Sequence, residues 1–62
     1  MQEYENLKRL VDEAADDIGK AEGGNKAAGT RVRKKMQEIK AAAQAVRQKI
    51  LEGREAEPGG VA

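Results

Sequence analysis

Apolar residues recur along the chain at intervals of three and four, and the series is interrupted once near the middle. In the first half the apolar positions are Tyr4, Leu7, Val11, Ala14, Ile18 and Ala21. In the second half they are Val32, Met36, Ile39, Ala43, Val46 and Ile50. This spacing is typical of a narrow apolar seam on one side of an α-helix. The pattern therefore predicts an all-α protein with one helix over about residues 2–22 and another over about 26–52.

The interruption consists of Gly23, Gly24 and Asn25. Glycine adopts positive φ without steric cost and commonly ends a helix, and asparagine is a favoured N-cap of the helix that follows. Apolar positions at equal distances on the two sides of Asn25 correspond to one another, as Ile18 does to Val32. A chain that reverses direction at residue 25 brings these positions into register. We therefore expect an antiparallel two-helix hairpin.

One uninterrupted helix over residues 2–52 is the alternative. It would place two adjacent glycines inside a helix, at a cost of about 2 kcal/mol, and would break the seam with two consecutive steps of four residues. The hairpin explains both irregularities, so we prefer it. In a hairpin Gly29 falls opposite Ala21, and we expect it to let the two backbones approach closely near the turn.

A two-helix hairpin buries little apolar area, and several seam positions are alanines. We expect a second copy of the chain to complete an antiparallel four-helix bundle. The residues expected to contact that copy lie beside the seam and are Leu10, Ala15, Ala42 and Leu51. The alternative is a weakly stable monomer that exposes these residues. The hairpin domain spans residues 1–53, and residues 54–62, with Pro58-Gly59-Gly60, are expected to form a flexible tail.

The composition argues against catalysis and ligand chemistry. The 62 residues include no Cys, His or Ser, so the usual nucleophiles, general bases and metal ligands are missing. We expect neither an enzyme nor a cofactor, metal or small-molecule site. No apolar run approaches the roughly 18 residues of a membrane span. We expect a soluble protein of the cytoplasm.

Charge is distributed unevenly although the net charge is only +1. Six acids and two bases lie between Met1 and Gly19, whereas six bases and one acid lie between Lys20 and Lys35. Such asymmetry suggests an anionic partner for the basic segment. The six bases form a candidate phosphate-binding cluster at the turn: Lys20, Lys26, Arg31, Arg33, Lys34 and Lys35.

The segment KAEGGNKAAGTRVRKK, residues 20–35, resembles the bacterial linker-histone-like family typified by the chlamydial histone-like nucleoid protein. The matching positions are Lys20, Ala21, Glu22, Gly24, Asn25, Lys26, Ala27, Ala28, Arg31 and Arg33. The resemblance covers the helical body and implies DNA binding and nucleoid condensation. Well-known members also carry a long Lys/Ala/Pro-rich tail, where this sequence has a short segment containing two acids. The resemblance implies a bacterial nucleoid location.

The expected partner is double-stranded DNA, bound through its phosphates without sequence specificity. No aromatic residue lies in the basic cluster for base stacking, and no helix face offers a set of base-reading side chains. We expect Lys26, Arg31 and Lys34 to be free for DNA. Arg33, Lys40 and Arg47 recur every seven residues beside the seam, and we expect these flanking bases and Lys35 to pair with acids of the first helix. Asp17 is the expected partner of Arg33 or Lys35, and Glu3 of Arg47. The alternative function is a non-enzymatic protein-interaction or coiled-coil module.

Overall fold

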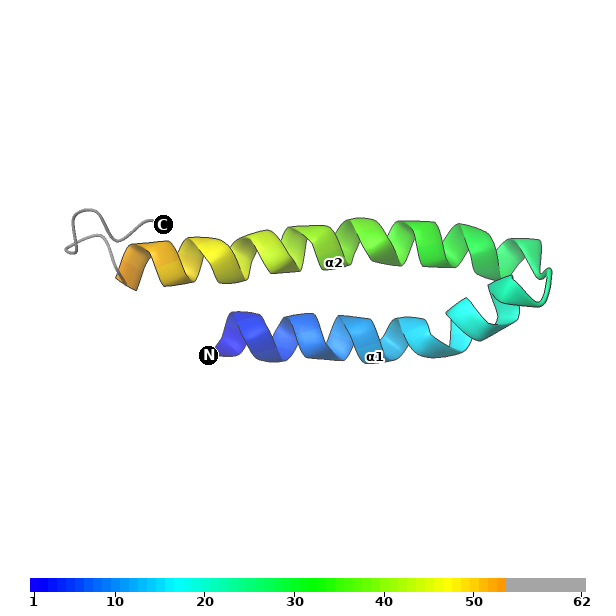
Figure 1. Ribbon diagram of the computed structural model, residues 1–62, viewed down its shortest axis with the longest axis horizontal. Helices are drawn as coiled ribbons and strands as arrows, with labels where there is room; N and C mark the ends of the chain where they lie inside the picture. The colour runs from blue at the N-terminus through cyan, green and yellow to red at the C-terminus, as the bar shows by residue number, and fades with distance from the viewer. Residues whose placement is uncertain (54–62) are drawn as a thin grey trace.

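The computed structural model describes residues 1–53, which form two helices, α1 (Gln2–Glu22) and α2 (Lys26–Gly53). The helices lie side by side and antiparallel, joined by a short turn (Figure 1). The principal extents of the molecule are 49 × 19 × 13 Å. The predicted hairpin is confirmed, with helix ends within one residue of the expected ones, and the single continuous helix is wrong. Residues 54–62, where a flexible tail was expected, lie outside the described part of the chain.

The turn is built from the residues that the sequence singles out. The Gly24 amide donates to the Ala21 carbonyl (3.0 Å) and the Asn25 amide to the Lys20 carbonyl (3.0 Å). These two bonds define a Schellman motif, in which the residue after the helix has positive φ. Gly24 occupies that position with φ of 101°. Asn25 then begins α2, because its side-chain Oδ1 accepts a hydrogen bond from the Ala28 amide (2.9 Å).

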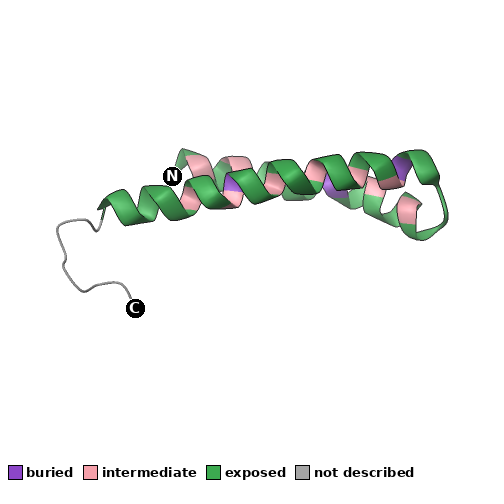
Figure 2. Cartoon of the chain, turned by 90° about the horizontal axis from the view of Figure 1, so that it is seen from above, coloured by how far each residue is buried: buried purple, intermediate pink, exposed green. Residues whose placement is uncertain are grey.

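The interface between the helices is small and rich in alanine. Its buried residues are Leu10 and Ala14 on α1, and Ala28 and Ala42 on α2, with exposed fractions of 8%, 2%, 0% and 7%. Figure 2 shows that buried segments are short and isolated and that most of both helices is exposed. Leu7, Val32, Ile39 and Val46 surround them and are half-buried. Close packing is thus achieved mainly by small side chains.

The contact face of α1 is rotated relative to the predicted seam. Leu10 is buried, whereas its neighbour Val11 is 50% exposed; Tyr4 and Ile18 are exposed as well. Positions 3, 7, 10, 14, 17 and 21 have the same three-four spacing as the predicted seam and share positions 7, 14 and 21 with it. The rotation buries the larger Leu10 in place of Val11 and turns Asp17 toward α2. The sequence pattern alone favours neither solution.

The structure corrects two further expectations, one about contacts with a second copy and one about Gly29. Leu10 and Ala42, expected to contact a second copy, are buried inside the hairpin itself. Gly29 was expected to allow a close approach of the backbones, but a Cβ at Gly29 would have no neighbouring atom within 4 Å. The residue that packs closely at this level is Ala28, which is fully buried. Leu51 is exposed near the end of α2, which extends past the N-terminus of α1 (Figure 1).

The two long edges of the hairpin differ in character. Because successive residues of a helix are 100° apart, Val11 and Ile18 lie on one side of the α1 contact face, and Glu13 lies on the other side. The same geometry places Met36 of α2 beside Val11 and Ile18. We call the exposed set Tyr4, Val11, Ile18 and Met36 the apolar edge.

Neither helix, over residues 1–53, has a stretch long and apolar enough to span a membrane.

Candidate nucleic-acid interface

The six bases of the predicted cluster lie at or near the turn end of the hairpin, but three of them are held in ion pairs. Arg31 makes a two-point contact with Asp17 of α1: its Nε donates to Oδ2 (3.0 Å) and its Nη2 to Oδ1 (2.9 Å). Such a fork fixes the guanidinium in one orientation. The predicted seam placed no acid opposite Arg31, so we expected Arg31 to have no acidic partner. This expectation is wrong.

Lys35 makes the second contact between the helices. Its Nζ lies 3.0 Å from Glu13 Oε1 on α1 and 3.6 Å from Glu38 Oε1 on α2. Lys35 therefore pairs with α1, as expected, but its partner is Glu13 and not Asp17. Lys20 is paired within α1, with its Nζ 3.4 Å from Asp16 Oδ2.

These contacts shift the protonation equilibria of the groups that make them. The hydrogen bond from Lys35, and secondly that from Arg9, lowers the pKa of Glu13 below its ordinary value. The hydrogen bond from Arg31 lowers the pKa of Asp17 in the same way. Reciprocally, Asp17 raises the pKa of Arg31, and Glu13 raises that of Lys35. Each of these pKa shifts favours the charged form of its group, as expected for partners in an ion pair.

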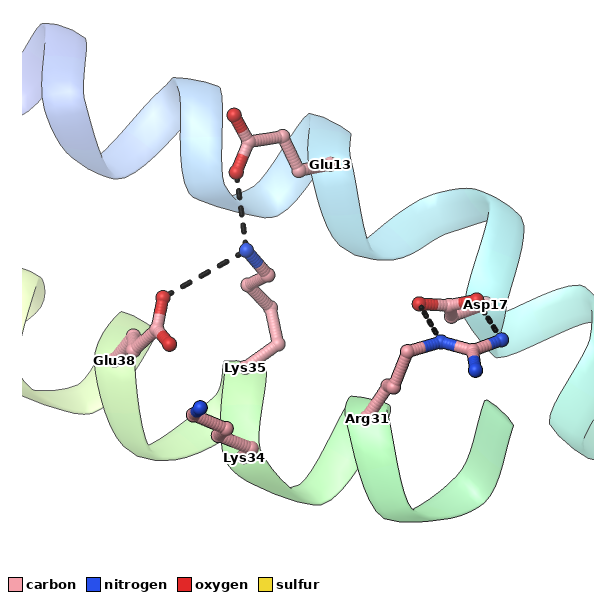
Figure 3. A pocket seen from close by; sticks show the side chains of 6 residues that line it. All are labelled: Glu13, Asp17, Arg31, Lys34, Lys35 and Glu38. Carbon is pink, nitrogen blue, oxygen red and sulfur yellow. Dashed lines mark hydrogen bonds and ion pairs between the residues drawn. The ribbon is translucent and has the colours of Figure 1, made fainter. Parts of the chain in front are cut away.

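The paired residues line an open groove of about 330 Å³ on one edge of the hairpin. Figure 3 shows Glu13 and Asp17 reaching from α1 toward Lys35 and Arg31 of α2, with Glu38 beside Lys35 and Lys34 at the rim. Three carboxylates and three bases meet here, so the charges of the groove balance. A balanced, open groove offers little net attraction to a polyanion. We call this side of the hairpin the ion-pair edge.

Several other bases form no ion pair within residues 1–53. Among the cluster these are Lys26, Arg33 and Lys34, and farther along α2 they include Lys40 and Arg47. The expected pairs of Arg33 with Asp17 and of Arg47 with Glu3 are therefore wrong. Arg47 donates instead to the uncharged Gln44 Oε1 (3.1 Å).

Four of these bases are regularly spaced; from the sequence we noted the repeat for Arg33, Lys40 and Arg47 and assigned those three to helix pairing. Lys26, Arg33, Lys40 and Arg47 are each seven residues apart, and all are exposed. The spacing of seven residues between these bases can be read directly from the sequence. What the sequence could not supply was the rotation of α1, which turns Asp17 toward Arg31 and not toward Arg33. Lys40 and Arg47 were consequently left out of the predicted site.

The charge of the whole hairpin is divided between its helices. α1 carries seven acids and three bases, whereas α2 carries eight bases and two acids. The fold and the charge distribution define a class of small two-helix proteins. One helix is acidic, the other is strongly basic, and a glycine-asparagine turn joins them. The sequence profile of the family described as Histone H1-like protein Hc1 matches residues 1–56.

The chain therefore belongs to the histone H1-like protein Hc1 family. The resemblance seen in residues 20–35 is confirmed, and it extends over nearly the whole chain. No curated protein and no solved structure matches the chain.

Proposed function

We propose that this protein is a small histone-like DNA-binding protein of the bacterial nucleoid, which contacts the phosphates of double-stranded DNA without sequence specificity. Membership of the histone H1-like family supports DNA as the partner. The observation that carries the proposal is the excess of bases on α2, several of which have no acidic partner within residues 1–53. Unneutralised bases on an exposed helix attract a polyanion and release its counterions.

The mode of contact follows from the residue types that are present. The single aromatic residue, Tyr4, lies at the start of α1, far from the turn, so stacking on bases has no support. Lys and Arg on an exposed helix contact phosphates without reading sequence. Of the six bases proposed at the turn end, Lys26, Arg33 and Lys34 are free to do so. Lys20, Arg31 and Lys35 would first have to exchange a carboxylate for a phosphate.

Fluorescence anisotropy with labelled duplexes tests the proposal. We expect binding that is nearly equal for A·T-rich and G·C-rich duplexes and that weakens steeply with salt. If three to four phosphates are contacted, the slope of log affinity against log salt is about −3 to −4. If the chain showed no salt-dependent DNA binding at 50 mM salt, the proposal would be wrong. A strong preference for one sequence would contradict the phosphate mode.

We propose further that two copies of the chain associate through the apolar edge. Three arguments support this. Within residues 1–53 the interface between the helices buries only one large side chain, Leu10. The apolar edge leaves Val11 50% and Tyr4 49% exposed. On α1 its residues Tyr4, Val11 and Ile18 are seven apart, the repeat with which helices pack against further helices. A second copy seated there would complete a four-helix bundle.

Sedimentation over a range of concentrations tests the association. We expect wild type to form dimers at high micromolar concentration, and the double variant V11K/I18K to remain a monomer that keeps its helicity. The matched control is A41K/A45K, which adds the same charge at exposed positions of α2 away from the apolar edge. The control is expected to dimerise as wild type does. A wild-type monomer at all concentrations, or a dimer of V11K/I18K, would contradict the proposal.

A further inference from the structure

Four bases of α2 lie in one line along the helix. Lys26, Arg33, Lys40 and Arg47 repeat every seven residues, and each is exposed. A repeat of seven drifts by about 20° per step on a straight α-helix, so the four bases stay within about 60° of one another. At 1.5 Å per residue they span about 32 Å. We call this set the α2 stripe.

The helical neighbours of the α2 stripe are all uncharged. Side chains three and four positions away lie next to one another on a helix surface, and an acid there would form a local ion pair. On α2 the positions three or four residues from a stripe base are occupied by Gly29, Thr30, Met36, Gln37, Ala43, Gln44, Ile50 and Leu51. None of these eight residues carries a charge.

The exposed bases of α1, in contrast to those of the stripe, have acids as helical neighbours. On α1, Arg9 pairs with Glu13, Lys8 with Glu5 and Lys20 with Asp16, each at a spacing of three or four residues. A helix face that serves only for solubility mixes both signs in this way. The α2 stripe instead repeats one sign over about six turns of helix, residues 26–47, without a compensating acid on its own face.

The acids of α1 do not reach the stripe either. Glu13 and Asp17 are engaged at the ion-pair edge, by Lys35 and Arg31. Helical periodicity puts the stripe on the outward side of α2, roughly 100–160° around the helix from the face that contacts α1 and beyond Met36 of the apolar edge. The two interhelical ion pairs therefore hold Glu13 and Asp17 away from the stripe. Within residues 1–53 no stripe base takes part in an ion pair.

We infer that the α2 stripe is the main DNA-contacting surface of this protein, in place of a cluster confined to the turn. The inference rests on the proposed DNA binding and specifies its site. The stripe is about as long as one turn of duplex, roughly 34 Å, so its Lys and Arg side chains can contact DNA phosphates spread over about one turn. Gln37 and Gln44 flank the stripe and supply uncharged donors for phosphate oxygens.

The inference separates residues that the turn cluster grouped together. Lys26 and Arg33 belong to the stripe, whereas Lys34 lies about 100° from Arg33 around the helix, at the rim of the ion-pair groove. Lys20, Arg31 and Lys35 are neutralised by carboxylates at 3.4 Å or less. Lys40 and Arg47, which lie well away from the turn, become contact residues.

The test compares two variants that each remove four positive charges. The stripe variant is K26Q/R33Q/K40Q/R47Q, and the control is K8Q/R9Q/K20Q/K49Q, whose sites are exposed and lie outside the stripe and outside the two interhelical ion pairs. Both variants have the same net charge, so a difference between them reports position. Helicity by circular dichroism verifies that each is folded. Duplex affinity is then measured from 50 to 200 mM salt.

We expect the stripe variant to lose up to four phosphate contacts. The slope of log affinity against log salt should then become shallower by about 3.6, and the corresponding roughly 150-fold salt effect between 50 and 200 mM should disappear. The control should retain most of the wild-type slope. The single variants R33Q and R47Q, which leave three stripe bases in place, should each reduce the slope by about 0.9.

The outcomes distinguish this inference from the proposed function on which it rests. If wild type binds and the stripe variant keeps the wild-type slope, the stripe is wrong and DNA binding stands. Equal losses in the two variants would mean that net charge alone governs binding, which also overturns the stripe. If wild type does not bind duplex DNA at all, the proposed function fails, and the stripe with it. Should the quadruple variant be unfolded, R47Q decides, since unchanged binding by R47Q removes the far end of the stripe.

Discussion

Replacing Leu10 and Val11 separately by alanine measures which side of α1 faces α2. Leu10 is 8% exposed and Val11 is 50% exposed, although they are neighbours. Leucine-to-alanine changes in protein interiors cost about 2–5 kcal/mol, and Leu10 packs against a single neighbouring helix, so we expect about 2 kcal/mol. Val11→Ala removes half-solvated atoms and improves helix propensity by a few tenths of a kcal/mol. We expect it to change the free energy of unfolding by about 0.5 kcal/mol or less.

Thermal unfolding followed by far-ultraviolet circular dichroism reads out this difference. For a chain of this size 1 kcal/mol shifts Tm by about 4–8 °C, so Leu10→Ala should lower Tm by about 8–16 °C. Val11→Ala should lower it by less than about 4 °C in dilute protein. Its effect should grow with concentration, because Val11 lies in the proposed dimer interface. Equal losses from the two variants at the lowest concentration would refute the rotation of α1 described above.

Two further predictions concern the glycines and the ion pairs. Gly29→Ala should stabilise the hairpin by about 1 kcal/mol, because α2 is helical at this position and the new Cβ meets open space. Gly24→Ala should destabilise the hairpin by about 1 kcal/mol, because φ at this position is 101°. Urea unfolding measures both changes, and a loss of stability in Gly29→Ala would contradict the open space around Gly29. Hydrogen bonds from α2 lower the pKa values of Glu13 and Asp17 in the folded state below their ordinary values of 4.5 and 3.8. The unfolded chain therefore binds more protons, and the contribution of these groups is present above those values and lost as the pH falls through the lowered ones. Helicity followed from pH 6 to pH 2 should fall less steeply in E13Q/D17N than in wild type, and equal acid sensitivity would show that other carboxylates dominate.

The turn was predictable because its determinants are local. Gly24 supplies the positive φ, and Asn25 caps α2 through its own side chain three residues away. Neither feature depends on how the helices are rotated. The same is true of the helix bounds, since propensity and caps are properties of neighbouring residues. Charge asymmetry and the motif around the turn pointed to the histone-like family on equally local grounds.

The rotation of α1 was not predictable, because two overlapping seams fit the same pattern. One contains Val11 and Ile18, the other Leu10 and Asp17, and the centres of the two faces differ by less than the width of an apolar stripe. Alanine-rich sequences distinguish such alternatives poorly, since every face offers small side chains. The choice depends on contacts between helices, including the two-point contact of Asp17 with Arg31. Pairing partners inferred from the wrong rotation were consequently wrong for Arg31 and Arg33.

The rotation also connects the fold to the proposed DNA contact. An α1 turned toward Val11 would rotate Asp17 and Glu13 away from α2 and so break their contacts with Arg31 and Lys35. The observed rotation buries Leu10 and directs Glu13 and Asp17 to one edge, where they neutralise Lys35 and Arg31. The bases that remain uncompensated are then those on the opposite side of α2, spaced by seven residues. Packing between the helices thus determines which bases are left for a polyanion, and a substitution that reversed the rotation should free Arg31 and Lys35 and steepen the salt dependence of DNA binding without adding any base.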